Sequence, residues 1–513
     1  MAEPWIWINF SPIDMATFKS TAASLLAKRA INKDRSWISQ PEATQLKVLQ
    51  SLMSEAKDTA FGKDHHFDEI HNFSDLKKHV PIRDYEALRP YMDRVVDGEA
   101  DVVWPGRPTY FAKTSGTTSG AKFIPLSKAS VPFHVKAASH ALFAHIVNSG
   151  NADFINGKMI FLQGSPKLDD IHGVATGRLS GITAHFTPSY LKKNRLPSWE
   201  ANIIEDWEEK LDAIVKETVH EDMTLIAGIP PWVQMYFERL LEVTGKQTIA
   251  EVFPNLALFV TGGVAYEPYK ARFEALLGKK VDTLQTYAAS EGFIAYQDQA
   301  DSEDMLLALD NGIAYEFIPA DQFFDESPPR LSIAAVEIGV NYAVIMHTNA
   351  GLWGYSIGDT VAFVSLEPCR LKVTGRIKHF ISAFGEHVIG SEVEHAMRLA
   401  AKAFGGVVKE FTVAPQVLPE AGLPYHEWLI AFDKQPADLA AYALALDKAL
   451  CEKNSYYKDL IVGGVLRTCV VTPLTTDAFI HYMKSIGKLG GQNKVPRLTN
   501  DRAIVDALSA YKV

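Results

Sequence analysis

The chain has 513 residues, of which 47% are hydrophobic and 22% are charged. That is enough for two or more globular domains with buried cores, and it excludes an intrinsically disordered protein. The formal net charge of -10 would repel phosphates, which argues against general nucleic-acid binding. The three cysteines, Cys369, Cys451 and Cys469, form no CxxC pair, which argues against a cysteine zinc site and fits a reducing compartment.

The N-terminal segment lacks a basic stretch followed by an apolar run, so no signal peptide is predicted. The longest apolar stretch, residues 331–346, is interrupted by Glu337 and Asn341. It is too short and too polar to span a bilayer. We therefore expect a soluble, cytoplasmic protein without a membrane partner.

The first part of the chain is predicted to be mainly helical. Residues 41–100 have a polar, helical composition, and residues 129–148 carry apolar side chains at helical spacing. Residues 158–164 form a short apolar run that ends in glycine, which is typical of a buried strand.

Strands and helices then alternate along residues 222–291. Strands are predicted at 222–228, 256–260 and 281–287, and helices at 230–245 and 269–278. This alternation predicts parallel strands joined by right-handed crossovers. Small and polar residues follow each strand, at the edge where open α/β sheets bind ligands.

The rest of the chain changes pattern twice. Residues 305–365 read as antiparallel strands, with Asp310-Asn311-Gly312 as a hairpin turn. After Gly375 a small α+β pattern begins, with a capping box at Ser391–Glu394, a helix near 438–453 and a strand near 466–471. The predicted fold is α/β: a large N-terminal domain (1–375) with a mainly parallel sheet, helices and a β-subdomain, and a small mobile α+β domain (376–513).

Residues 114–122, TSGTTSGAK, combine glycines, hydroxyls and a lysine. Such a segment can wrap backbone N–H groups around an anion, and a lysine adds charge. It is not a Walker A loop, because no Ser or Thr follows the lysine. On composition alone, a flexible polar turn is an equally good interpretation.

Four segments in order resemble the adenylate-forming superfamily of acyl-CoA synthetases and nonribosomal adenylation domains. Besides TSGTTSGAK they are Tyr287–Glu291 (YAASE), Tyr355–Asp359 (YSIGD), and Gly375-Arg376 followed by residues 384–388 (FGEHV). Together they span about half of the chain and are a specific match.

Within that superfamily the chain resembles the Gretchen Hagen auxin-responsive family of acyl-acid amido synthetases. The likeness is carried by residues 59–99, by Asn454–Tyr457 (NSYY) and by Gly491–Arg497 (GQNKVPR). The chain is shorter than the plant members and is similar to a bacterial-type relative, so plant hormone specificity is not carried over.

The resemblance implies roles for the residues of the phosphate loop. The loop residues would hold the phosphates of ATP; they are Ser115, Gly116, Thr117, Thr118, Ser119 and Gly120. Lys122 would neutralise the leaving pyrophosphate, and Glu291 would hold Mg²⁺ on the phosphates, since magnesium prefers oxygen ligands.

Other residues would bind the adenosine part of ATP. The resemblance implies that Tyr287 stacks on adenine, that Gly262 and Gly263 give the ring room, and that Asp359 binds the ribose hydroxyls. Arg376 would contact ribose or phosphate, or brace the hinge. A core aromatic is a nearly equal alternative for Tyr287, and a hairpin-turn aspartate is the alternative for Asp359.

The hinge and the C-terminus give weaker expectations. His379, after Lys378, stands where the superfamily often has an Asp or Lys hinge residue. Lys494 would be the C-terminal lysine that contacts the adenylate in the first step, although a solvated lysine fits as well. Arg376 and Lys494 are also the cations expected to receive the carboxylate of an amino acid.

The implied reaction joins a carboxylic acid to ATP and passes the acyl group to the amine of an amino acid. A thioester ligase that uses coenzyme A shares the first step, and a non-catalytic nucleotide-binding relative is a third alternative. The acid, the amine and the oligomeric state stay open. A metal site at Asp64-His65-His66, with nearby Asp68, Glu69 and His71, is disfavoured because adjacent histidines point to different sides.

Overall fold

The computed structural model describes residues 12–114, 122–186, 193–263, 266–300, 302–377, 380–381, 383–384, 386, 388–462, 465–489, 494–500 and 502–513. The predicted phosphate loop (Ser115–Gly120) and the hinge residues Lys378 and His379 lie outside these residues.

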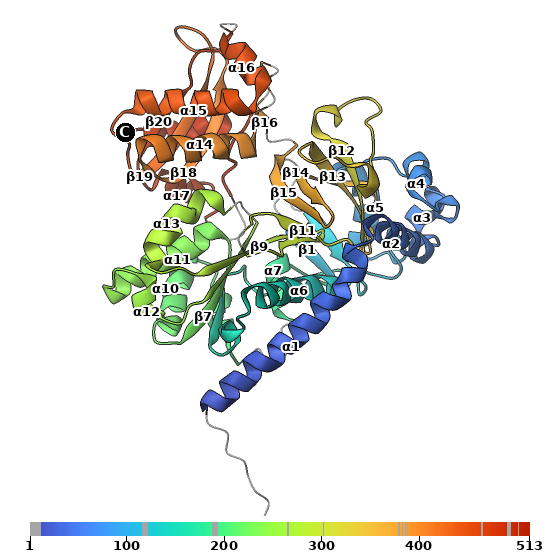
Figure 1. Ribbon diagram of the computed structural model, residues 1–513. Helices are drawn as coiled ribbons and strands as arrows, with labels where there is room; N and C mark the ends of the chain where they lie inside the picture. The colour runs from blue at the N-terminus through green and yellow to red at the C-terminus, as the bar shows by residue number, and fades with distance from the viewer. Residues whose placement is uncertain are drawn as a thin grey trace, which may run out of the picture.

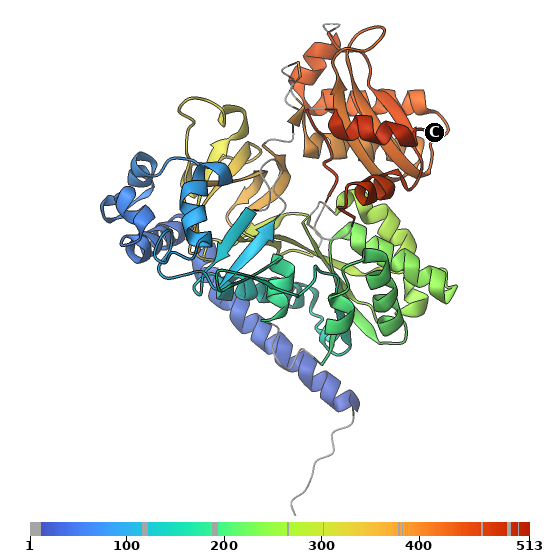
Figure 2. The same cartoon turned by 180° about the vertical axis from the view of Figure 1, so that it is seen from behind.

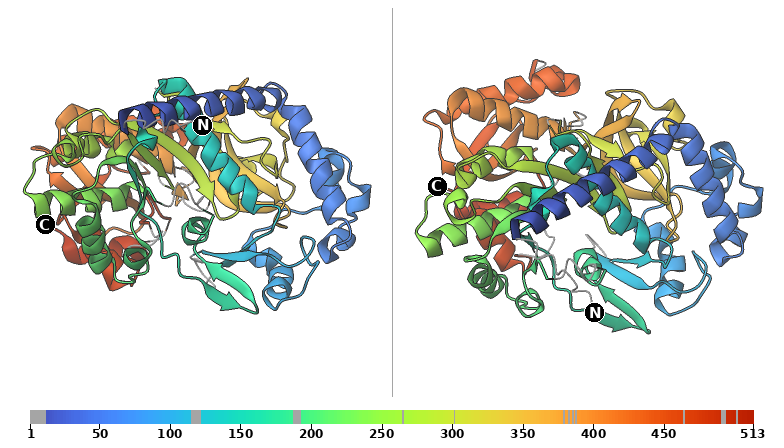
Figure 3. Two further views of the ribbon diagram at one scale, coloured as in Figure 1. Left: turned by 90° about the horizontal axis from the view of Figure 1, so that it is seen from below. Right: turned by 60° about the horizontal axis from the view of Figure 1, so that its bottom comes forward.

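Helices dominate residues 12–96, as predicted for residues 41–100. The long helix α1 (Pro12–Ile38) lies along α6 (Val131–Ser149) across one face of the molecule (Figure 3). Four shorter helices follow: α2 (Pro41–Ala56), α3 (Ala60–Asp64), α4 (Phe73–His79) and α5 (Tyr85–Val96). Asn72 and Asp84 cap α4 and α5 by accepting hydrogen bonds from backbone N–H groups of the first turn.

An eleven-stranded sheet forms the centre of the large domain (Figure 1). Its strands, in spatial order, are β12 (Ile313–Pro319), β13 (Asn341–Thr348), β14 (Tyr355–Leu366), β15 (Cys369–Arg376), β11 (Met305–Leu307), β10 (Gly292–Gln297), β9 (Asp282–Ala289), β8 (Leu258–Gly262), β7 (Met223–Ala227), β3 (Lys158–Phe161) and β6 (Arg195–Leu196).

The half of this sheet from β9 to β6 is parallel, which confirms the prediction for residues 222–291. Alternate side chains enter two cores: Leu225 and Leu258 on one face, Ile226 and Phe259 on the other. Helix α6 packs into the first core, and three helices pack into the second: α10 (Trp207–Thr218), α11 (Pro230–Thr244) and α13 (Glu267–Leu277). Helices on both faces are the usual way to bury parallel strands.

The other half, from β12 to β9, is antiparallel, as predicted for residues 305–365. The predicted hairpin at residues 310–312 is wrong, because β11 and β12 are not neighbours in the sheet. The turn at residues 310–312 instead packs against neighbouring segments of the large domain. Asn311 is buried and donates to the Phe293 carbonyl at 2.8 Å, and a Cβ at Gly312 would lie 2.4 Å from the Asn349 side chain.

A second, four-stranded sheet carries the segment around the phosphate loop. Its order is β2 (Lys122–Leu126), β1 (Tyr110–Thr114), β5 (Val174–Gly177) and β4 (Asp169–Ile171). Strands β1 and β2 are antiparallel partners, with Thr114 opposite Lys122. The two ends of the predicted phosphate loop are therefore fixed side by side.

The C-terminal part is a separate α+β layer that stands over α11 and α13 (Figures 1 and 2). A three-stranded sheet, β18 (Val407–Gln416), β19 (Tyr425–Lys434) and β20 (Val470–Leu474), packs on α14 (Gly390–Phe404) and α15 (Leu439–Lys453). The capping box predicted at Ser391–Glu394 is wrong: Ile389 is the N-cap, and its N–H donates to the carboxylate of Glu392 at 3.0 Å.

Candidate active site

The carboxyl ends of β8 and β9 meet at a crowded edge of the large sheet. A Cβ at Gly262 would lie 2.6 Å from the Thr286 carbonyl oxygen, so only glycine fits this approach. Gly263 follows in the left-handed region with a φ of +77°, which glycine adopts without strain. The two glycines therefore allow close packing of the backbone at this edge.

Tyr287 and Asp359 lie next to each other across this edge. The Tyr287 hydroxyl donates to Asp359 Oδ2 at 2.7 Å, and Arg376 Nε donates to Asp359 Oδ1 at 2.8 Å. Burial and the Asp359 charge hold the pKa of Tyr287 well above its ordinary value, and Asp359 raises the pKa of Arg376. Three residues of three predicted motifs therefore form one cluster, from β9, β14 and β15.

Glu291 lies just after β9, partly buried beside this cluster. The Tyr355 hydroxyl donates to its carboxylate at 3.3 Å. Burial raises the pKa of Glu291, and the Arg376 and Lys122 charges lower it only in part. Among the residues that the structure describes, no cation lies within ion-pair distance of this carboxylate. Glu291 is thus a negative charge with room for a cation.

Lys122, at the start of β2, is held against the N-terminal helices. Its Nζ lies 5.6 Å from the centre of the Tyr85 ring, in a cation–π contact, while the Tyr85 hydroxyl accepts a hydrogen bond from the Phe123 N–H at 2.9 Å. Its charge acts on Glu291. No motif in the sequence indicated that Tyr85 would contact Lys122.

Lys494 reaches the same edge from the C-terminal layer. A Cβ at Gly263 would lie 3.3 Å from Lys494 Nζ, and the Lys494 charge interacts with Asp359 and Arg376. Lys494 is exposed as a whole residue, yet desolvation lowers its pKa to about 8. The placement favours the interpretation of Lys494 as a site residue over a fully solvated lysine.

Phe384 and Glu386, from the FGEHV segment, join a buried polar network in the C-terminal layer. Glu386 accepts from the Phe384 N–H at 2.8 Å and pairs with His426 at 2.9 Å. Asn454, from the NSYY segment, donates to the Glu386 carbonyl and to the Glu392 carboxylate. Two of the sequence signatures therefore support each other.

The C-terminal layer also contacts the large domain through charged side chains. Arg497, from the GQNKVPR segment, forms an ion pair with Glu410 and donates to the Tyr269 hydroxyl at 3.0 Å. That hydroxyl in turn donates to Glu410 at 3.1 Å. Because Tyr269 lies on α13, these bonds hold the layer where Lys494 meets Gly263.

The histidine-rich segment of residues 64–71 is structural. His65 stacks on Phe61 with ring centres 3.9 Å apart, and its Nε2 lies 2.8 Å from Arg83. Asp64 accepts from Tyr91 at 2.8 Å. In the described part of the chain no group of three or more His, Cys, Asp or Glu side chains could hold a metal ion.

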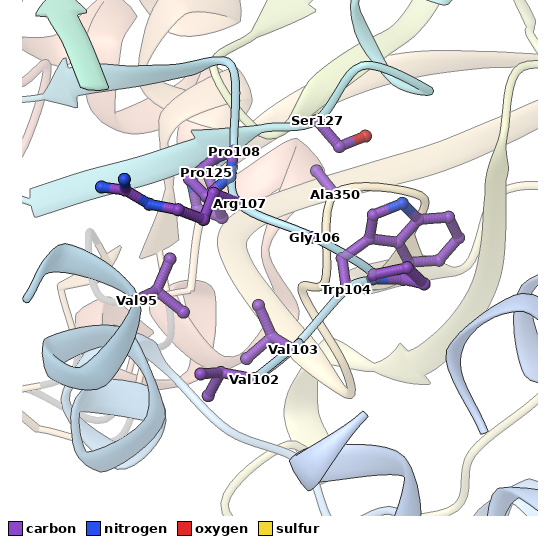
Figure 4. Close-up of a pocket in the computed structure, with 11 residues that line it drawn as sticks. Val95, Val102, Val103, Trp104, Gly106, Arg107, Pro108, Pro125, Ser127 and Ala350 are labelled. Carbon is purple, nitrogen blue, oxygen red and sulfur yellow. The ribbon is translucent and has the colours of Figure 1, made fainter. Parts of the chain in front are cut away.

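The hollow under β1 and β2 is too small for a ligand. Figure 4 shows it between Val103, Trp104 and Pro125, and its volume is about 10 Å³, close to one water-sized sphere.

No helix among the described residues has the length and apolarity to cross a membrane.

Comparison with known proteins supports one family along the chain. Family models match at residues 31–194 (GH3 family N-terminal domain), 306–376 (GH3 family central domain) and 391–503 (GH3 family C-terminal domain). An indole-3-acetic acid-amido synthetase, GH3.3 from Arabidopsis thaliana, is 22% identical over 91% of each chain.

Solved structures share the fold. The acyl acid amido synthetase AtGH3.15, in complex with 2,4-DB, superposes with a TM-score of 0.76 at 14% identity over 99% of this chain and 98% of its own. A 2-hydroxyisobutyryl-CoA ligase in the postadenylation state gives 0.58 at 14% identity over 91% of each chain. From the family models and the matching fold, the chain belongs to the GH3 family, which confirms the resemblance seen in the sequence.

Proposed function

We propose that the protein is an ATP-dependent acyl-acid amido synthetase, which adenylates a carboxylic acid and transfers the acyl group to the amine of an amino acid. The observation that carries the proposal is the cluster at one sheet edge. Asp359, Tyr287 and Arg376 lie side by side there, Glu291 lies beside them, and Lys494 reaches them from the other layer.

In the first half-reaction a carboxylate oxygen attacks the α-phosphorus of ATP and pyrophosphate leaves. Both reactants are anions, so the protein acts by positioning them and by neutralising charge. Lys122 would face the leaving pyrophosphate, at one end of the loop 115–120. Asp359 would exchange its bonds to Tyr287 and Arg376 for bonds from the ribose hydroxyls, and Gly262-Gly263 would leave room for adenine against Tyr287.

Mg²⁺ fits the Glu291 carboxylate, because this group is partly buried, has a raised pKa and has a hydroxyl as its neighbour. Bound there, the metal would neutralise phosphate charge. Glu291 is its proposed protein ligand, and Tyr355 would orient the carboxylate through its hydroxyl.

In the second half-reaction the amine nitrogen attacks the acyl carbon of the adenylate, AMP leaves and the nitrogen loses a proton. An α-amine with a pKa of roughly 8 has a usable unprotonated fraction at neutral pH. The amido synthetases named among the relatives support an amine acceptor. The small acid and the amino acid are the proposed partners.

The domain boundary at residues 375 and 376 is part of this proposal. Gly375 has a φ of +154°, and a Cβ there would lie 3.2 Å from the Gly390 N. A pivot here would carry Lys494 into or out of the site between the two half-reactions.

A cytoplasmic location is supported by free thiols at Cys369, Cys451 and Cys469.

The test is product identification by mass spectrometry. Purified protein is incubated with ATP, Mg²⁺ and a panel of carboxylic acids, with mixed amino acids in one arm and coenzyme A in the other. An amide with AMP and pyrophosphate is expected in the first arm. A thioester in the second arm, with no amide from any amino acid, would replace the proposal by a coenzyme A ligase.

A further inference from the structure

A group of cations gathers around Gln163, just beyond the carboxyl end of β3. Arg178 is the N-cap of α7 (Leu179–Ala184), Arg195 begins β6, and Lys210 lies on α10. Their elements follow one another between residues 178 and 218, and no sequence motif joins the three residues. None of the three has a role in the proposed nucleotide site.

Lys210 is buried with neutral partners. It is 4% exposed, and its Nζ donates to the carbonyl oxygens of Gln163 at 3.2 Å and Asn202 at 2.7 Å. No carboxylate of the described residues lies within ion-pair distance of Lys210 or Arg178, and residues 187–192 (TPSYLK) contain no acid. Proteins rarely bury a lysine without an anion, because the desolvation of its charge is not compensated.

Lys210 and Arg178 also repel each other. Burial, helped by the nearby Arg178 charge, lowers the pKa of Lys210 to about 8, and burial lowers the pKa of Arg178 and of Arg195, the latter to about 10. Arg195 donates to Gln163 Oε1 at 2.8 Å and lies over the Phe161 ring at 4.7 Å. A bound anion would relieve this repulsion.

Gln163 adds a free donor to the group. Its side chain is 9% exposed, and its Nε2 is buried without a hydrogen-bond partner within the described part of the chain. Arg195 fixes the amide orientation by donating to Oε1. Buried polar atoms are almost always satisfied, so this N–H pair points to a ligand acceptor.

The cations lie on the same sheet edge as the nucleotide cluster. Strand β3 is two strands away from β8, which is about 10 Å at the usual strand spacing. Contacts continue from one to the other: a Cβ at Gly228 would lie 3.1 Å from Leu162 Cβ, and one at Gly263 would lie 3.3 Å from Ile229 Cγ2. A small molecule with its reacting group near β8 can therefore reach the cations.

We infer that Lys210, Arg178 and Arg195, with the Gln163 amide, form a subsite for a carboxylate of a substrate. The inference rests on the proposed function, which offers two sources of that carboxylate: a second carboxylate on the acyl acid, or the carboxylate of the acceptor amino acid. A hydrocarbon acid with a single carboxylate and a simple amine would leave the hydrogen-bond donors of these three cations and the amide unused.

The test compares Lys210→Met with Lys216→Met, which removes an exposed lysine of the same helix. Loss of a charge-assisted hydrogen bond should raise one KM roughly 10- to 100-fold and leave the KM for ATP unchanged. The KM for the acid is measured by pyrophosphate exchange without amine, and the KM for the amino acid by amide formation.

A raised KM for the acid, with loss of a preference for dicarboxylic over monocarboxylic acids, identifies the acyl acid as the source. A raised KM for the amino acid alone identifies the acceptor. If both constants stay within twofold of wild type in a folded Lys210→Met protein, the lysine only braces the Gln163 and Asn202 carbonyls and the inference is wrong. Arg178→Gln, at a half-buried position, provides the same test should Lys210→Met not fold.

Binding can be read without activity. Glutarate and L-glutamate are added to each variant, and the shift of the melting temperature is recorded. A shift in wild type and in Lys216→Met that is absent from Lys210→Met supports the subsite, and equal shifts in all three, or none in wild type, overturn it. Should wild type show no exchange with any acid, the proposed function fails, and this binding measurement alone decides on the subsite.

Discussion

Two glutamates of the large domain, one on a sheet strand and one in the turn between β9 and β10, have opposite surroundings. Glu316, on β12, is fully buried and has both oxygens occupied: Arg330 donates to each of them, and His347 Nε2 donates to Oε2 at 2.9 Å. Among the described residues, Glu291 receives one side-chain hydrogen bond, from Tyr355. The partners of Glu316 lower its pKa, whereas burial raises that of Glu291.

This difference indicates that Glu316 is a structural residue, whereas Glu291 belongs to the proposed site. The Glu316 group is complete, since Arg330 also donates to the Val80 carbonyl at 2.5 Å and His347 Nδ1 accepts from the Gly354 N–H at 3.2 Å. It fixes the turn that leads into Tyr355. Removing one partner of a completed buried ion pair is strongly destabilising, whereas an incompletely paired buried carboxylate is a place where a ligand can supply the missing charge.

The largest expected effect is on stability, in Glu316→Gln. This change leaves the buried Arg330 charge without its carboxylate, which should cost about 3–5 kcal/mol of unfolding free energy. Urea unfolding followed by circular dichroism measures it, with Glu337→Gln, an exposed position, as the control. A loss below about 1 kcal/mol would show that Glu316 is not the scaffold residue described above.

Glu291→Gln should do the reverse. It removes a charge that in the proposed function binds the metal, so acid-dependent pyrophosphate exchange should fall about 100-fold or more. Stability should stay the same or rise slightly, because a buried charge is removed. Exchange and urea unfolding are measured on the same protein. Near-normal exchange at low Mg²⁺ would count against the metal role.

Lys494 should give a pH dependence of the first half-reaction. Its pKa of about 8 lies below the ordinary value, so it loses its proton, and its charge, as pH rises through about 8. Pyrophosphate exchange should therefore decline above that pH in wild type, by roughly tenfold for each unit well above it. Lys494→Arg, which stays charged, should remove this decline. An identical profile in both proteins would exclude Lys494 as its cause.

The smallest effect is expected at the contact between the layers. Tyr269→Phe removes the hydroxyl that joins Arg497 and Glu410, which is about 0.5–1.5 kcal/mol of hydrogen bonding. The exchange rate should fall by roughly two- to tenfold, because Lys494 would be held against Gly263 for less of the time. Transfer from a preformed adenylate should change less. Equal losses in both half-reactions would contradict a role in domain placement.

Much of this molecule could be predicted from its sequence. The parallel strands and crossover helices of residues 222–291 follow from local apolar spacing, which the buried sheet requires. The hairpin at residues 310–312 could not be predicted, because a turn sequence does not tell which strands will pair. Here β11 lies between β10 and β15, and β12 pairs with β13.

The site divides in the same way. Asp359, Tyr287, Glu291 and Arg376 were found through motifs, and the structure brings them together, although their roles stay proposals. Tyr85 and Lys210 gave no signal, because their positions depend on packing between distant segments. Spacing in the sequence says nothing about such contacts.

The most direct measurement is acid-dependent exchange of labelled pyrophosphate into ATP, without amine or coenzyme A. Wild type, Glu291→Gln and Glu316→Gln are compared at equal concentrations of folded protein. We expect exchange that requires a carboxylic acid, that is nearly lost in Glu291→Gln, and that is retained per folded molecule in Glu316→Gln. Wild-type protein that exchanges with no acid, or a Glu291→Gln protein that exchanges like wild type, would contradict it.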